Sequence, residues 1–150
     1  MSCFLSRRIH SYPVEDSAVA MLYFENGSIG VVDAFFCIPD QSSKNALELY
    51  GDKGSIIACG TIGQSEQGRM TVWLDCAQAG YDAEQHRAER QGLAICPPPV
   101  NMYRAEVEEF SRALIENRPP SVGVEIGLRS QKILAACYES AAAGRAVEIR

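Results

Sequence analysis

The stretch Ala18–Cys37, AVAMLYFENGSIGVVDAFFC, decides the fold of this chain. Two apolar runs flank Asn26-Gly27, and both residues tolerate the positive φ that a two-residue type I′ turn requires. This pattern predicts a long β-hairpin. Neither arm alternates cleanly between apolar and polar residues, as strands of a sheet with one solvated face do. We therefore expect the chain's own helices to cover one face of the hairpin, and another domain or chain to cover the second.

The period of two residues in a strand predicts which hairpin side chains share a face. In the first arm, one face carries Val19, Met21 and Tyr23, and the other carries Ala20, Leu22 and Phe24. In the second arm, one face carries Ile29, Val31 and Phe35, and the other carries Val32, Ala34 and Phe36.

Short turn-rich connections link the hairpin to further strands at 45–50, 55–58 and 70–74, which favours sequential antiparallel pairing. A short edge strand at 9–12 and a final strand at 147–149 are also predicted. Apolar residues at helical spacing predict one helix from Tyr103 until Pro119-Pro120 stops it, and a second over about 125–143. The fold class is α+β: one open-faced, mostly antiparallel sheet of five or six strands, with both helices packed on one face.

Composition limits the partners of the chain. Its 150 residues suit a single domain, and the net charge of −5 with no basic block makes nucleic acid an unsuitable partner. No apolar run approaches the ~20 residues needed to span a membrane, and residues 1–10 do not resemble a signal peptide. We expect a cytoplasmic protein that makes no membrane contact.

The cysteine pattern indicates reduced thiols that act as small core hydrophobes. Six cysteines, with no Cys-x-x-Cys pair and only two histidines, argue against a zinc site. No metal site is predicted.

No residue is assigned to cofactor binding or catalysis, because both the Gly-x-Gly-x-x-Gly loop and the Gly-Lys-Ser/Thr loop are absent. Four side chains remain as substrate-face candidates. Asp33 lies mid-strand, where it either faces a cleft or is paired or exposed. His86 lies in a long polar loop over 76–101, which either binds a substrate or is solvated. Trp73 and Tyr103 either stack on a sugar or pack in the core or an interface.

Several short motifs occur in a characteristic order along the chain. They are Glu15-Asp16 before the first long strand, the Asn26-Gly27 hairpin, the turn at 50–54, Glu106 and Phe110 on one helix, and Ser140 and Gly144 near the end of the next. From residue 14 onward this order resembles the C-terminal domain of the glucose–fructose oxidoreductase / inositol dehydrogenase (Gfo/Idh/MocA) family.

The resemblance implies an NAD- or NADP-dependent dehydrogenase of sugars, cyclitols or related polyols. In that family a Rossmann domain carries the nicotinamide site and the catalytic lysine, and these segments precede the matched region. They are absent from residues 1–150, so we expect this chain to be inactive by itself. We expect it to be the substrate-lining and oligomerisation domain, forming a dimer or higher homo-oligomer through the open sheet face.

Two alternatives stay open. One is a stand-alone dimerisation module without catalysis. The other is a free-standing small-molecule-binding protein or enzyme that uses Asp33, His86 and the 76–101 loop.

Overall fold

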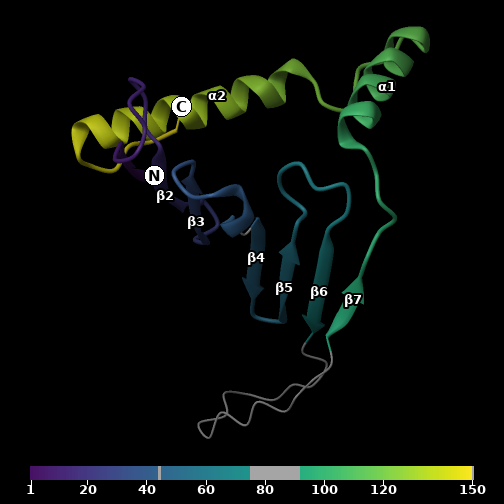
Figure 1. Cartoon of the computed structure of the whole chain (residues 1–150), viewed down its shortest axis with the longest axis horizontal. Helices are drawn as coiled ribbons and strands as arrows, with labels where there is room; N and C mark the ends of the chain where they lie inside the picture. Colours follow the sequence, from purple (N-terminus) through teal and green to yellow (C-terminus); the bar gives the residue numbers. More distant parts are fainter. Residues whose placement is uncertain (44, 75–91, 150) are drawn as a thin grey trace, which may run out of the picture. The chain divides into compact units, whose positions relative to one another are not determined.

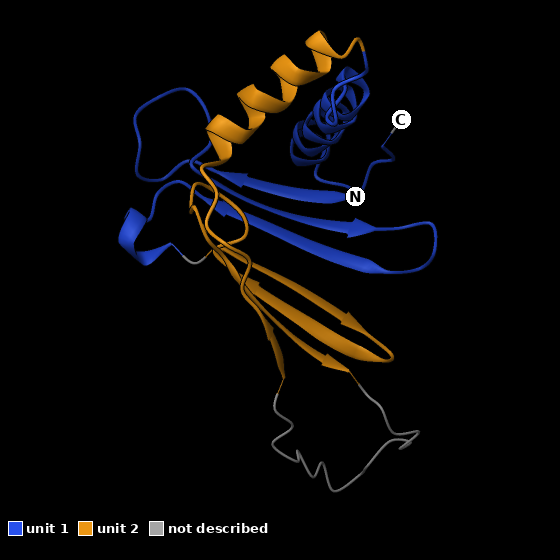
Figure 2. Ribbon diagram, turned by 90° about the vertical axis from the view of Figure 1, so that its right-hand side faces the viewer, with its two compact units in different colours: residues 1–43, 118–150 blue, residues 44–117 orange. Residues whose placement is uncertain are grey.

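The computed structural model describes residues 1–43, 45–74 and 92–149. The chain divides into two compact units, residues 1–43 with 118–150 and residues 44–117 (Figure 2). Each unit has a sheet and a long helix of its own (Figure 1). The α+β class and the antiparallel pairing are confirmed. The described strands form two hydrogen-bonded sheets, of three and four strands, in place of the single sheet of five or six that was predicted.

The sheet of the first unit has the order β1-β2-β3, with β1 (Ser2–Ser6), β2 (Ser17–Tyr23) and β3 (Ile29–Phe35) all antiparallel. The predicted hairpin is confirmed as β2 and β3, and the cross-strand register places Met21 opposite Val31 and Ala20 opposite Val32. The predicted sharing of faces is therefore confirmed for the residues within these two strands, whereas Phe24 and Phe36 lie just beyond their ends.

The turn of this hairpin differs from the prediction. Gly27 has φ 85°, but Asn26 is not among the described residues with positive φ. Phe24 N–H donates to the carbonyl of Ser28, which leaves a three-residue loop over 25–27. A type I′ turn is therefore wrong. The Asn26 side chain explains the difference, because its Oδ1 accepts from both N–H and Oγ of Ser28 and stabilises the longer turn.

Helix α2 (Val124–Ala143) packs on β1. Small side chains line this contact and allow a close approach: Cys3 and Ala20 are buried on the sheet, and Ala136 and Ser140 are buried on the helix. The helix ends at Gly144, whose φ of 61° is the left-handed conformation that glycine adopts most easily. This predicted helix and its glycine end are confirmed.

The ends of the chain meet at this unit. Met1 and Val147 exchange two backbone hydrogen bonds, of 2.6 Å from the terminal ammonium and 2.9 Å from the Val147 N–H. The predicted final strand at 147–149 is reduced to this single pair. The predicted edge strand at 9–12 is wrong, because no strand is present there and the backbone N–H groups of Ile9 and His10 donate to a side chain, described below.

The second unit contains a four-stranded antiparallel sheet in chain order. Its strands are β4 (Ala46–Gly51), β5 (Gly54–Cys59), β6 (Arg69–Leu74) and β7 (Leu93–Ile95). The first three match predicted strands, whereas β7 lies in the segment predicted to be a loop. A short 3-10 helix, η1 (Asp40–Ser42), belongs to the first unit and lies at the end of its segment 1–43.

Helix α1 (Met102–Ile115) of the second unit confirms the other predicted helix. It begins at Asn101, whose side chain accepts a hydrogen bond from Arg104 N–H at 2.9 Å and so caps the helix. The predicted apolar stripe lies on the surface of the chain, since all four of its members are more than half exposed: Tyr103, Val107, Phe110 and Leu114.

Candidate functional site

The main candidate is the face of the first sheet that α2 leaves uncovered, which we call the open face. Cross-strand register aligns its residues in rows, such as Phe4, Val19 and Asp33. Phe4 is 75% exposed and Val31 is 65% exposed, which is unusual for side chains of this kind. The exposed apolar members of the open face are Phe4, Met21, Tyr23, Ile29, Val31 and Phe35. The apolar second face predicted from the hairpin is therefore present.

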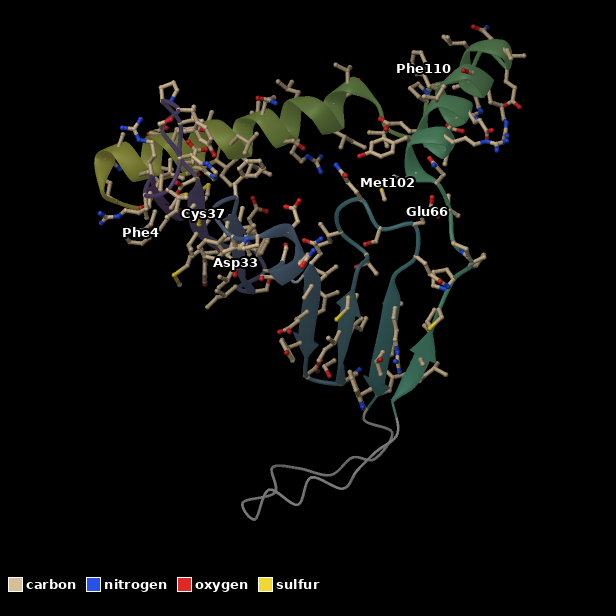
Figure 3. The ribbon with its side chains drawn as sticks, viewed as in Figure 1. Phe4, Asp33, Cys37, Glu66, Met102 and Phe110 are labelled. Atoms are coloured by element: carbon tan, nitrogen blue, oxygen red, sulfur yellow. The ribbon has the colours of Figure 1, made fainter. Side chains whose placement is uncertain are left out.

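Asp33 is the charged residue of this face, and it is exposed (Figure 3). It pairs across the strands with Val19. A carboxylate that becomes covered needs a donor or a cation opposite it, because an unpaired buried charge is costly. Any surface that covers the open face must therefore supply such a group at Asp33.

A second feature is a carboxylate clasp centred on Asp16, which is only 2% exposed. Asp16 Oδ2 accepts three backbone N–H bonds, from Arg8 at 3.0 Å, Ile9 at 2.8 Å and His10 at 3.1 Å. Its Oδ1 accepts from Ser17 Oγ at 3.0 Å. These hydrogen bonds, of which the one from Ile9 has the largest effect, hold the pKa of Asp16 well below its ordinary value in spite of its burial. So acidic a group is a poor general base, and we interpret the clasp as structural.

The clasp orders a small aromatic cluster. The rings of His10 and Tyr12 stack with centroids 4.9 Å apart and planes 13° apart, and Phe36 lies 5.9 Å from His10. Burial, followed by the nearby Asp16 carboxylate, raises the pKa of Tyr12. The sequence analysis did not single out this cluster. The sequence signal available for it was Asp16, an aspartate that directly precedes a strand and follows a polar loop.

Both residues of the Glu15-Asp16 motif are anchored. Glu15 Oε1 accepts a 2.6 Å hydrogen bond from the hydroxyl of Tyr138 on α2, and this bond raises the pKa of Tyr138. The motif therefore holds the loop at 7–12 on one side and α2 on the other. In this chain its role is to organise the first unit.

The other sequence candidates belong to the second unit or lie outside the described residues. Trp73 is half-buried on β6, and Gly92 lies so close that a Cβ there would be 2.7 Å from the indole. Tyr103 is 56% exposed on α1. His86 and most of the 76–101 loop lie outside the described residues. Because Asp33 belongs to the first unit, the grouping of these four side chains stays a prediction.

The described residues do not fit a nicotinamide dinucleotide. Such cofactors bind where a parallel strand leads through a glycine loop into a free helix N-terminus. Here both sheets are antiparallel, Asn101 occupies the start of α1, and Glu125 places negative charge in the first turn of α2. No reaction step is therefore assigned to a cofactor held by this chain.

Two further properties concern the described residues only. No group of three or more His, Cys, Asp or Glu side chains is arranged there as metal ligands would be. Neither described helix is long and apolar enough to cross a membrane.

Comparison with known proteins gives one family. The model of an oxidoreductase family, C-terminal alpha/beta domain (Gfo/Idh/MocA), matches residues 5–149. No curated protein matches the chain by sequence.

Solved structures share the fold. The aldose–aldose oxidoreductase of Caulobacter crescentus, complexed with glycerol, is 20% identical with a TM-score of 0.73, over 98% of this chain and 40% of that one. A levoglucosan dehydrogenase, in complex with NADH and L-sorbose, is 20% identical with a TM-score of 0.74, and the match covers 99% of this chain and 44% of that one. The putative oxidoreductase yvaA of Bacillus subtilis is 14% identical with a TM-score of 0.66, and the match covers 99% of this chain and 45% of that one. The chain thus spans less than half the length of these proteins.

Proposed function

Because the chain belongs to the Gfo/Idh/MocA oxidoreductase family, as its C-terminal α/β domain, we propose that it lines the substrate site and forms the oligomer of a dehydrogenase. The dehydrogenase would use NAD or NADP and act on a sugar, a cyclitol or a related polyol. Two solved relatives of the fold support this substrate class, since one holds L-sorbose with NADH and the other holds glycerol.

The open face is the observation that carries the proposal. Soluble monomers rarely expose a contiguous apolar patch of more than a few hundred Å². Phe4, Met21 and Val31 are each more than half exposed on one face of the first sheet, which would be covered in an assembly. We propose a homo-oligomer, a dimer or larger, that uses this face in the cytoplasm.

Hydride transfer requires a bound nicotinamide, and the protein's part is to position it against the substrate. The described residues lack a place for that cofactor, so a Rossmann domain must supply it in the complete enzyme. The chain by itself is therefore proposed to be inactive. Its contribution is to shape the substrate pocket and to hold the subunits together.

Titration of NADH fluorescence against the 150-residue protein tests whether the chain alone holds the cofactor. We expect no saturable change, and saturable binding in the micromolar range would contradict the proposal. A thermal-shift screen with sugars and polyols is the companion measurement. A ligand that stabilises the isolated chain would favour the small-molecule-binding alternative over a domain that depends on its partner.

The open face equally favours a second candidate function, a dimerisation module without catalysis. The two functions differ in whether the native gene product includes a Rossmann domain. The intact mass of the protein isolated from its source distinguishes them, because a full enzyme of this family is more than twice the length of this chain if it matches the solved relatives.

A further inference from the structure

Two thiols meet where α2 packs on β1. Cys3 is 4% exposed, and its backbone N–H donates to Ser140 Oγ on α2 at 3.0 Å. Cys137 precedes Ser140 by three residues, which places the two on the same side of the helix. The Cys137 side chain is near enough to Cys3 to raise the pKa of its thiol. Both thiols therefore belong to the same contact between β1 and α2, which is built from small side chains.

The two thiols differ in how they meet solvent. Burial raises the pKa of the Cys3 thiol, and the adjacent Cys137 acts in the same direction. Cys137 is only half-buried. Because reagents reach an accessible thiol first, Cys137 is the group that an oxidant meets and Cys3 is the neighbour placed to complete the reaction.

We propose that Cys3 and Cys137 form a disulfide under oxidising conditions and thereby join β1 covalently to α2. The Cys137 thiolate attacks one sulfur of a low-molecular-weight disulfide, which forms a mixed disulfide and releases one thiol. Cys3 loses its proton to solvent and attacks the Cys137 sulfur, which releases the second thiol. The protein loses two hydrogens and two electrons, and the oxidant becomes two thiols.

The disulfide would act on the covered side of the first sheet. Cys3 and Cys137 are near opposite ends of the sequence, so their link closes a loop over most of the chain. A cross-link of this kind stabilises a fold mainly by restricting the unfolded chain, and more so for a longer loop. The open face carries neither cysteine and would remain unchanged. The inference is independent of the proposed function.

The test uses the 150-residue protein and oxidised glutathione as the probe. After oxidation, free thiols are alkylated and the protein is digested with trypsin without reduction. We expect the peptides 1–7 and 133–145, which contain Cys3 and Cys137, to appear as one linked species that reduction separates. The melting temperature should rise on oxidation and return on reduction.

Two matched variants complete the experiment. Cys137→Ser should abolish both the linked peptide and the rise in melting temperature. Cys59→Ser removes an exposed cysteine of β5 and should leave both unchanged. The proposal is overturned if glutathione remains on Cys137 as a stable mixed disulfide, if the linked peptides contain other cysteines, or if the folded protein resists oxidation at both residues. Disulfide mapping of the parent protein decides whether Cys3 and Cys137 are linked, even where a variant folds poorly.

Discussion

The hydroxyl of Ser140 accepts a 3.0 Å hydrogen bond from the backbone N–H of Cys3, a residue 137 positions away. The same hydroxyl donates to the carbonyl of Arg145 at 2.7 Å. Ser140 is 1% exposed, so water cannot replace either bond. One small side chain thus joins β1, α2 and the segment that follows the helix.

Replacing Ser140 tests this junction. Ser140→Ala leaves the buried Cys3 N–H without its acceptor, and we expect the free energy of unfolding to fall by about 1–3 kcal/mol. Urea denaturation followed by circular dichroism measures the change. Ser130→Ala is the matched control, because this exposed serine of the same helix bonds only to the carbonyl of Ile126 and should change stability by less than about 0.5 kcal/mol. Equal losses in the two variants would refute the role of Ser140.

The Asp16 clasp predicts sensitivity to acid. Its pKa is lowered in the folded state, so its stabilising effect is present above the unfolded pKa of about 3.9 and is lost as the pH falls below it. The melting temperature should therefore decrease steeply between about pH 4 and the acid limit of the fold. Asp16→Asn should melt roughly 5–10 °C lower at pH 7 and lose part of this acid dependence.

The control for the clasp is Asp40→Asn, which removes an exposed carboxylate of η1 in the same unit, away from the open face. Its melting temperature at pH 7 should stay within about 2 °C of the parent protein. The clasp loses its assigned role if the Asp16 variant melts at the parent temperature.

The turn between β4 and β5 predicts opposite outcomes for two neighbouring glycines. Gly54 has φ 150°, and a Cβ there would lie 2.1 Å from the carbonyl oxygen of Trp73, which cannot move without disturbing β6. Gly54→Ala should cost about 2–3 kcal/mol. At Gly51 the nearest atom would be 3.8 Å away, so Gly51→Ala should cost under about 1 kcal/mol. Hydrogen exchange of the β5 amides should accelerate only in the Gly54 variant.

The open face predicts self-association that a single charge disrupts. Val31→Lys places a cation in the middle of the apolar patch, where burial in an assembly would be unfavourable. Sedimentation velocity should show an oligomer for the parent protein and a shift to monomer for this variant. Ile62→Lys changes a similarly exposed apolar residue of a loop in the second unit and should leave the oligomer intact. A parent protein that sediments as a monomer would exclude the assembly proposed for the open face.

Local patterns predicted the elements of this chain well. The helices match because their apolar periodicity is long, and because prolines after α1 and Gly144 after α2 stop them. The strands β4–β6 match because glycine-rich turns separate them. The turn at 25–27 does not, since the side chain of Asn26 bonds to Ser28 and selects a three-residue loop. The candidate residue His86 lies outside the described residues, so its role remains a prediction.

The sequence alone determined the α+β class, the antiparallel pairing and the apolar character of both hairpin faces, because each depends on neighbours within a few residues. Only the tertiary structure decided what buried polar groups do. Asp16 accepts hydrogen bonds from N–H groups of a loop, such as that of Ile9, which sequence patterns assigned to a strand. Ser140 bonds to Cys3, near the opposite end of the chain. Such partners follow from which groups become enclosed together and must satisfy one another without water, and no local periodicity records that.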